Sequence, residues 1–310
     1  MSQISVKQPG ALAKQFRPLN LFGHIFLLLG GLVMVYPLIF MVFAGFFTKE
    51  EYATTVLGLF PVAHEPTFDN FRVIFGGAKD PMVQKYFFNS VIRTIYSLIW
   101  ATFTAFLGGY VFARLRFKGR DGLFLLLLAT AMIPGTVSLI PTYIEYARWP
   151  FAGGNDIFMG GKGILDSWWV YLIGGPAINI MGTFLVKQSM EKVPYELDEA
   201  AKVDGASTFR LIFQILLPLQ LPILAFIAIS TAQGVWNDWF TPFFFTTSND
   251  IQTLPSAISR LSSLAANPMG LPDYPFMITL GLGITIPMLI IFFFFQRYIV
   301  QGMANAGLKG

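Results

Sequence analysis

Residues Glu199–Pro218 read E-A-A-K-V-D-G-A-S-T-F-R-L-I-F-Q-I-L-L-P, and this stretch is the most informative segment of the chain. The segment begins with polar and charged residues and lies between two long apolar runs. A defined polar segment in a chain with little other polar mass indicates a docking surface. The partner that binds there therefore determines the function.

The residues around this segment predict a short helix, a sharp turn and a second helix that leads into the membrane. Pro194 suits the first helical position, where its missing N–H costs nothing. Gly205 suits a position after the helix that needs a left-handed backbone. Ser207 or Thr208 can cap the second helix, and Pro218 marks a bend or the point where that helix meets the membrane.

The first of these helices is acidic, and this bears on what it binds. Carboxylates in its first turns favour the positive end of the helix dipole. An amphipathic helix lying on the inner leaflet is the alternative, but that leaflet is anionic and attracts Lys and Arg. The acidic side chains are Glu191, Glu196, Asp198, Glu199 and Asp204. At helical spacing one narrow face of the helix carries Leu197, Ala200, Ala201 and Asp204. Such a narrow face would fit into a groove on another protein.

Composition makes the chain a polytopic membrane protein. It has 310 residues, of which 55% are hydrophobic and 12% charged, against about 25% charged in a soluble domain. Six segments are long enough to cross about 30 Å of hydrocarbon, and helix is the conformation that satisfies their backbones there. They are Leu21–Phe47, Tyr86–Ala113, Gly122–Ile144, Ser167–Val186, Leu211–Asn237 and Tyr274–Gln296.

Charge distribution predicts the orientation. With residues 1–20 inside as a cytoplasmic segment, thirteen Lys and Arg lie in inner segments and seven in outer ones. The short basic loop Arg114–Arg120 weighs most, because short loops govern the positive-inside rule. Both termini are therefore predicted to be cytoplasmic. The net charge of +4 is assigned to this orientation and not to nucleic acid. The first span is too long for a signal-peptide core and is interpreted as a retained anchor.

Three stretches carry a resemblance to a known family. Glu199-Ala200-Ala201, Gly205 and the Ile215–Pro218 ending match the EAA loop of importer-type ABC transporter permeases at every fixed position. The runs Trp236–Phe240 and Phe295–Gly302, with the ending Gly307–Gly310, resemble the subgroup that includes the smaller maltose permease and the glycerol-3-phosphate permeases. The glycine-rich loop around Gly153–Gly163 departs from that subgroup, so no relative's substrate transfers directly.

The resemblance implies an all-α type I ABC importer permease fold with six transmembrane helices and a cytoplasmic coupling helix. The permease domain is 21–310, with a core at 86–300 and a coupling loop at 187–215. On this analogy the coupling helix docks into a cleft on a cytoplasmic ATPase. The contact residues are Glu199, Ala200, Ala201, Asp204 and Gly205, and the C-terminal contacts are Gln301, Gly302 and Lys309.

The implied assembly contains a second permease, two ATPase subunits and an extracytoplasmic binding protein, in the inner membrane of a prokaryote. The chain holds no G-x-x-x-x-G-K-[ST] motif, so Mg-ATP is expected on the partner ATPases and no cofactor on this chain. The loop 248–260 is placed like one that probes the binding protein, with a passive cap as the alternative.

The substrate pathway is less clearly marked. Gln233, Trp236 and Asn237 offer an aromatic face and amides for a sugar, while interhelical hydrogen bonds and interfacial anchoring are the alternatives. Arg93 is predicted to snorkel to the interface.

No carboxylate lies mid-span, which weakens the case for a stand-alone ion-coupled carrier. His24 and His64 are isolated, which weakens the case for a membrane enzyme. The favoured cargo is a sugar or oligosaccharide, and the alternative is glycerol 3-phosphate or a polyol.

Overall fold

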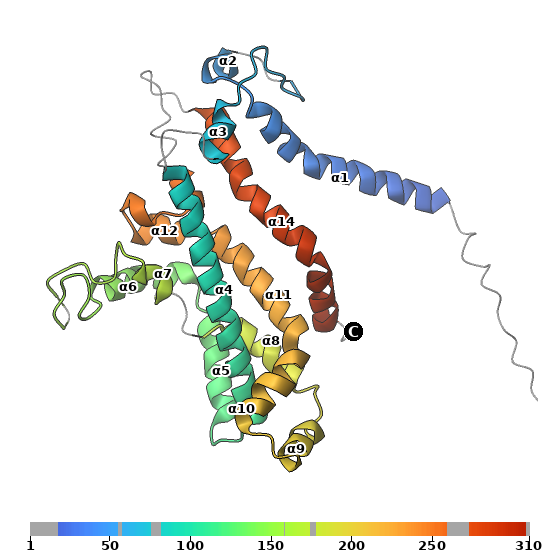
Figure 1. Cartoon of the computed structure of the whole chain (residues 1–310), viewed down its shortest axis with the longest axis vertical. Helices are drawn as coiled ribbons and strands as arrows, with labels where there is room; N and C mark the ends of the chain where they lie inside the picture. Colours follow the sequence, from blue (N-terminus) through green and yellow to red (C-terminus); the bar gives the residue numbers. More distant parts are fainter. Residues whose placement is uncertain are drawn as a thin grey trace, which may run out of the picture. The chain divides into compact units, whose positions relative to one another are not determined.

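The computed structural model describes residues 18–54, 58–75, 82–157, 159–173, 178–258 and 273–307, with the backbone alone at 18–20, 73, 75 and 297–307. All regular structure in these ranges is helical (Figure 1). The chain forms two compact units. One comprises Met1–Asn70 with Tyr274–Leu282, and the other comprises Phe71–Asp273 with Gly283–Gly310.

Four helices among the described residues are long and apolar enough to cross a membrane, and a bent pair makes a fifth candidate. The six continuous spans expected from the sequence are therefore not all present as single helices. The four long helices contain Leu21–Ala44, Met82–Arg114, Thr208–Trp236 and Tyr274–Gln296.

The predicted third span, Gly122–Ile144, is two helices and not one. α5 (Arg120–Ala131) and α6 (Gly135–Ala147) meet at an angle of 95°. Pro134 between them has an extended backbone, with φ −60° and ψ 131°. A proline cannot donate to the preceding turn and disfavours helical geometry in the residue before it. The prediction of one continuous helix here is wrong.

The predicted fourth span, Ser167–Val186, is also divided. α7 (Trp169–Leu172) is a single turn, and α8 (Ile180–Met190) starts afresh. Asn179 has an extended backbone, and its side chain accepts a hydrogen bond from the N–H of Gly182 at 2.8 Å. This is an ordinary N-cap, and it begins a new helix inside the expected span.

In the first unit, α1 (Pro18–Ala44) is followed by α2 (Lys49–Thr54) and a loop that leads to α3 (Asp69–Phe75). The side-chain amide of Asn70 donates to the carbonyls of Gly45 and Phe47, both at 2.9 Å. The hydroxyl of Tyr36 donates to the carbonyl of Leu59 at 2.7 Å. These bonds give the loop after the first long helix a defined conformation.

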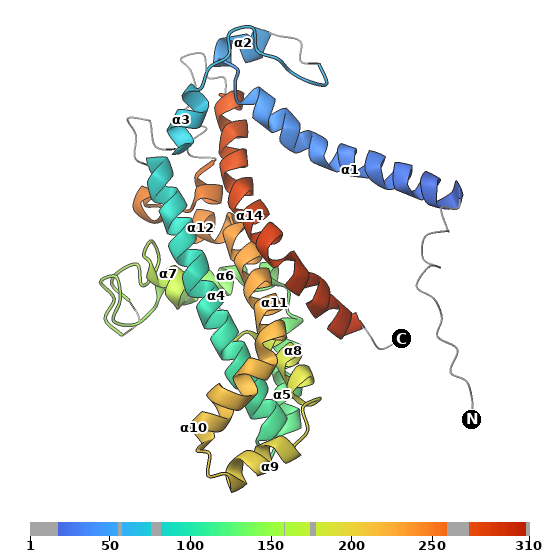
Figure 2. The same ribbon diagram turned by 45° about the vertical axis from the view of Figure 1, so that its right-hand side comes forward.

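In the second unit, α4 (Met82–Arg114) runs beside α11 (Leu217–Trp236) and α8, as both views show (Figures 1 and 2). Two glycines allow α4 and α8 to approach closely. A Cβ on Gly108 would lie 2.6 Å from Oγ1 of Thr183, and one on Gly109 would collide with Cγ1 of Val186. Small residues at helix contacts are the usual means of close packing in membranes.

The chain enters α11 through α9 (Glu196–Val203), α10 (Thr208–Arg210) and a π-helical turn, η2 (Leu211–Leu216). After α11 come α12 (Phe240–Phe245), the short 3₁₀ turn η3 (Asn249–Ile251) and α14 (Tyr274–Gly307). π-helical turns within helices are rare and frequently lie at functional sites.

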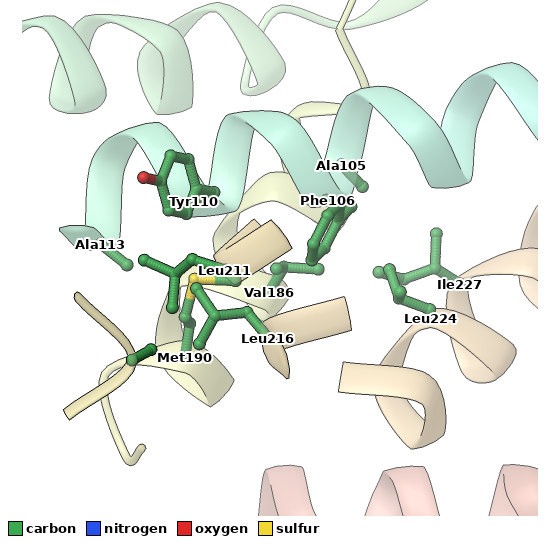
Figure 3. Close-up of a cluster of buried hydrophobic side chains, with 11 residues drawn as sticks. Ala105, Phe106, Tyr110, Ala113, Val186, Met190, Leu211, Leu216, Leu224 and Ile227 are labelled. Atoms are coloured by element: carbon green, nitrogen blue, oxygen red, sulfur yellow. The ribbon is translucent and has the colours of Figure 1, made fainter. Parts of the chain in front are cut away.

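A buried cluster joins α4, α8, α9, η2 and α11 at the end of α4 that carries Arg114 (Figure 3). Each element contributes buried apolar side chains from one of its faces, as helical periodicity allows. Its members are Ala105, Phe106, Tyr110, Ala113, Val186, Met190, Ala201, Leu211, Leu216, Leu224 and Ile227. We call this group the basal cluster.

Candidate functional site

α9 is built by local sequence signals. Its first turn holds Glu196, Asp198 and Glu199, and its last turn holds Lys202, so both ends complement the helix dipole. The helix begins at Glu196, two residues after Pro194, so Pro194 is not at its first position as predicted. Pro194 instead opens a preceding turn, in which its carbonyl accepts from the N–H of Leu197 at 3.3 Å.

The end of α9 is a Schellman motif. Gly205 has φ +75°, and its N–H donates to the carbonyl of Lys202 at 3.0 Å. The N–H of Ala206 donates to the carbonyl of Ala201 at 2.9 Å. These two bonds satisfy the last carbonyls of the helix. Ser207 then caps the next helix by accepting from the N–H of Arg210 at 3.3 Å. The predicted turn at Gly205 and the predicted cap are therefore confirmed as local structure.

The five residues predicted to contact an ATPase divide between two faces. Glu199, Ala200, Asp204 and Gly205 are exposed. Ala201 is 6% exposed and belongs to the basal cluster, so it supports the helix from within the chain. The narrow face predicted for Leu197, Ala200, Ala201 and Asp204 is therefore divided at Ala201. The exposed face also includes Val203, which is 87% exposed and which the sequence analysis did not select.

Asp198 also points inward, although the acidic pattern placed it with the carboxylates offered to a partner. Its carboxylate lies 3.4 Å from Nε of Arg114, at the end of α4. A second guanidinium nitrogen, Nη2, donates to the carbonyl of Val193 at 3.0 Å. The guanidinium stacks 4.3 Å over the ring of Tyr195, whose hydroxyl donates to the carbonyl of Ala113 at 2.7 Å. We call Arg114, Asp198 and Tyr195 the basal clamp.

Sequence reasoning missed this clamp. Arg114 was counted only as a positive charge that orients the chain, and Asp198 only as part of an acidic helix. The local sequence around Arg114 and around Asp198 explains each residue by itself. No local pattern links the two residues, because they lie far apart in the chain. An arginine that ends an apolar span directly, with an acidic helix elsewhere on the same side, is the one signal available.

Beside the middle of α4 lies a cavity of about 680 Å³. Aromatic rings and polar groups from α4, α7, the N-cap of α8, α11 and α12 share its wall, which is the mixture typical of small-molecule sites. Its polar and aromatic lining is Arg93, Tyr96, Ser97, Trp100, Tyr171, Asn179, Thr231, Asp238 and Thr241.

Arg93 in this wall does not snorkel toward a surface as predicted. It is 7% exposed and forms an ion pair with Asp238, at the end of α11. Its Nη1 also donates to the Asp238 carbonyl at 3.3 Å, and its guanidinium lies 4.8 Å from the ring centre of Tyr171. The other carboxylate oxygen of Asp238 accepts from the N–H groups of Phe240 and Thr241 and so caps α12. The cavity wall therefore carries balanced charge.

The three pathway residues predicted from sequence lie outside this lining. Trp236 is 3% exposed, packs edge-on against Phe87 and donates its indole N–H to the carbonyl of Ile284 at 2.9 Å. It is a packing residue, so its ring face is not open to a sugar. Gln233 and Asn237 are exposed. Together with Ser230 and Gly234 they form one polar, open face of an otherwise apolar helix.

The glycine-rich loop between α6 and α7 has a defined internal structure. The side chain of Asn155 donates to the carbonyls of Ala147 and Trp149 and accepts from the N–H of Gly161. Asp166 accepts from the N–H groups of Thr247 and Ser248 at 2.8 and 2.6 Å, which ties the loop to the segment after α12. Burial would raise the pKa of Asp166, but these N–H groups and the ammonium of Lys162 outweigh burial and lower it.

The predicted C-terminal contacts are only partly described. Gln301 and Gly302 lie in the backbone of α14, and Lys309 lies outside the described residues. Arg260, at the end of the predicted probing loop, also lies outside them. Among the residues that the structure describes, no three His, Cys, Asp or Glu side chains are grouped as metal ligands.

Comparison with known proteins places these features in a family. Residues 73–305 match the family described as binding-protein-dependent transport system inner membrane component. The chain is 31% identical over 297 residues to the galactooligosaccharides transport system permease protein GanQ of Bacillus subtilis, covering 94% of this chain and 95% of that one. It is 25% identical to the arabinooligosaccharides transport system permease protein AraQ of the same organism, covering 96% and 98%.

A solved structure has the same fold. It is a bacterial ABC transporter involved in the import of the acidic polysaccharide alginate, with a TM-score of 0.72 at 20% identity, covering 92% of this chain and 99% of that one. The family match over most of the chain, the near full-length relatives and the helical architecture agree with one another. The chain belongs to the inner membrane component family of binding-protein-dependent ABC transport systems.

Proposed function

We propose that this chain is one transmembrane subunit of an ATP-driven importer for a sugar or oligosaccharide, coupled to cytoplasmic ATPases through α9. Family membership and the named cargo of the relatives, galactooligosaccharides and arabinooligosaccharides, support the transport class. The complete assembly would add a second permease, two ATPase subunits and an extracytoplasmic binding protein. Mg-ATP would be bound and hydrolysed by the ATPase subunits.

The observation that carries this proposal is the exposed face of α9. A short acidic helix ends in a fixed left-handed turn at Gly205 and presents Glu199, Ala200 and Asp204 outward. Acidic side chains are repelled by an anionic lipid surface, and a basic groove on a protein attracts them. The coupling loop 187–215 would fit such a groove as a rigid body. The last turns of α14 and the tail with Gln301, Gly302 and Lys309 would add a second contact on the same side.

The cavity lined by Arg93 and Asp238 supports a neutral cargo. Aromatic rings and hydroxyl or amide groups suit sugar rings and their hydroxyls, and Asp238 already balances the positive charge of Arg93. A phosphorylated or acidic cargo would need an unpaired cation there. The balanced charge of the cavity wall favours a sugar over glycerol 3-phosphate as the cargo.

The exposed polar face with Gln233 and Asn237 is the second feature that suits a pathway. Polar side chains exposed on an apolar spanning helix are costly against lipid but not against water or a partner helix. We propose that this face lines a channel shared with the second permease, with both termini of the chain in the cytoplasm.

The test is charge reversal on α9 in the complete transporter, reconstituted in liposomes. Glu199→Lys should abolish sugar uptake and the stimulation of ATP hydrolysis by loaded binding protein, while the subunit remains in the membrane. Glu65→Lys, an exposed charge reversal far from α9 in the sequence, is the control and should transport normally. Uptake at the wild-type rate in Glu199→Lys, or a purified complex that contains no ATPase, would overturn the proposal.

A further inference from the structure

The exposed face of α9 can transmit movement only if the helix is fixed to a membrane span, and the basal clamp makes that connection. We propose that Arg114 and Asp198 are positioning residues that hold α9 to the end of α4, so that displacement of α9 becomes displacement of α4. This inference rests on the proposed function of α9 as the ATPase contact. It assigns a role to two residues that do not themselves face the partner.

The clamp attaches the end of α9 that the basal cluster does not hold. The second half of α9 is secured by Ala201 in that cluster and by the Schellman turn at Gly205. The first half has no side-chain cap of its own. Asp198 secures it by its contact with Arg114, and Tyr195 by its hydrogen bond to the carbonyl of Ala113 in α4. An eight-residue helix is too short to be stable alone, so these contacts decide where it lies.

The burial of this ion pair indicates positioning rather than stability. The side chains of Arg114 and Asp198 are 2% and 9% exposed. They approach at 3.4 Å without a hydrogen bond, and Nε and Nη1 of Arg114 and Oδ1 of Asp198 have no hydrogen-bond partner among the described residues. Burying two charges with incomplete hydrogen bonding gives little net stabilisation, and an apolar pair would serve stability equally well. The ion pair does specify that Arg114 and Asp198 lie together, because burying either charge without the other would cost free energy.

A nearby ion pair provides a matched control. Lys187 and Glu191 lie one turn apart at the end of α8, with the carboxylate 39% exposed. Both partners lie at the end of α8, so this ion pair does not join α9 to α4, although Lys187 also lies 5.0 Å over the ring of Phe124 in α5. Glu191→Gln removes the negative charge of this pair. It therefore breaks an ion pair in the same region while leaving the contact between α9 and α4 in place.

The experiment compares Asp198→Asn, Arg114→Gln, the double variant and Glu191→Gln in the complete transporter in liposomes. The measured quantity is ATP hydrolysed per sugar imported. We expect Asp198→Asn and the double variant to raise this ratio on the order of tenfold, a typical strength for coupling between two sites. Asp198→Glu should recover most of the coupling, and Glu191→Gln should leave the ratio unchanged.

Docking is measured separately. The chain has no cysteine, so Val203→Cys gives a single thiol on the exposed face of α9. If the clamp positions α9 without forming the ATPase contact, bound ATPase should protect this thiol from a maleimide reagent in Asp198→Asn as well as in the parent.

Two outcomes would overturn the inference. A wild-type ATP-to-sugar ratio in the double variant would overturn it, and so would loss of thiol protection, which would mean that the clamp only maintains the fold. If either single variant fails to insert because it leaves a buried charge unpaired, the double variant still carries the test. Normal uptake by Glu199→Lys would instead count against the proposed function itself, so the two failures are distinguishable.

Discussion

At the scale of single residues, Gly205 shows how one backbone conformation sets the shape of a surface. Its φ of +75° is left-handed, and a Cβ added there would meet no atom within 4 Å. The cost of a side chain at this position is therefore backbone strain and not a steric clash. For residues other than glycine and asparagine that strain is about 1–2 kcal/mol.

Gly205→Val is therefore expected to loosen the turn after α9 and reduce uptake severalfold. Gly205→Asn should retain most activity, because asparagine tolerates the left-handed region. Gly122→Val, at an equally open position with an ordinary helical backbone, is the control for side-chain bulk. Uptake is measured in liposomes at matched protein levels. Equal uptake for the valine and asparagine variants would contradict this account of the turn.

Asp166 gives a prediction about acid. Its pKa is lowered in the folded protein, so its carboxylate stabilises the loop between α6 and α7 above the unfolded pKa of about 4. That contribution is lost as pH falls through the lower, folded value. The Thr247 and Ser248 amides, which donate to Asp166, should be equally protected from hydrogen exchange from pH 5 to pH 8, after correction for intrinsic rates, and should lose protection only below about pH 4. Asp166→Ala should lose protection at every pH.

Asp238 and Arg93 give a prediction about stability. Asp238→Asn keeps an oxygen that can cap α12 but leaves Arg93 without its counter-charge. Removing one partner of a buried pair typically costs about 3–5 kcal/mol; less is expected here because the Asp238 side chain is 24% exposed. Thermal unfolding of the subunit in detergent should show that Arg93→Gln combined with Asp238→Asn is more stable than Asp238→Asn alone. Additive losses would mean that the two charges do not interact.

At the scale of elements, the sequence predicted long helices well and interruptions poorly. The apolar runs that contain α1, α4, α11 and α14 are long enough to cross a bilayer, and their prediction as long helices is confirmed. The same hydropathy argument joined α5 to α6 and α7 to α8. Hydropathy averages over a window, so it does not register a single Pro134 or an Asn179 that caps a new helix. Pro134 and Asn179 are both visible in the sequence, but the apolar residues around them dominate the averaged hydropathy.

The contact between α4 and α8 gives a prediction at this scale. Gly109→Ala would place a methyl group into Val186 and should destabilise the subunit by about 1–3 kcal/mol. Gly122→Ala, with no atom within 4 Å of the added Cβ, should be neutral or slightly stabilising, because alanine favours helix over glycine. Adding Val186→Ala to Gly109→Ala should recover part of the loss. Thermal unfolding in detergent measures all three variants, and equal unfolding temperatures would disprove the close contact.

At the scale of the whole molecule, the orientation still rests on the positive-inside rule and can be tested directly. Lys118 lies in the short basic loop before α5, and Met159 lies in the loop between α6 and α7; both are exposed. In cells, a membrane-impermeant maleimide added outside should label Met159→Cys and not Lys118→Cys. Permeabilised cells should show labelling of both variants. The reverse pattern would invert the predicted topology.

For the molecule as a whole, the sequence predicted the family but not the sites that the fold assembles. The EAA pattern at Glu199–Ala201 pointed to the family, because the fixed positions of that pattern all lie in one contiguous stretch of chain. The basal clamp and the cavity are made by residues that only the fold brings together, such as Arg114 with Asp198 and Arg93 with Asp238. For the same reason the sequence left the role of Trp236 open, because an aromatic residue near a helix end has the same local sequence whether it faces a cargo or packs inside.

α4 differs from the other long helices in one respect that bears on mechanical work. α1, α11 and α14 each contain a proline within the helix, whereas the 33 residues of α4 contain none. Arg93 and Arg114 therefore lie on one unbroken lever arm of about 32 Å. If the arm pivots near Arg114, a tilt of about 10° displaces Arg93 by about 5–6 Å, roughly one helical turn. Under the proposed coupling through α9, such a tilt would turn a small displacement at Arg114 into a movement large enough to reshape the cavity.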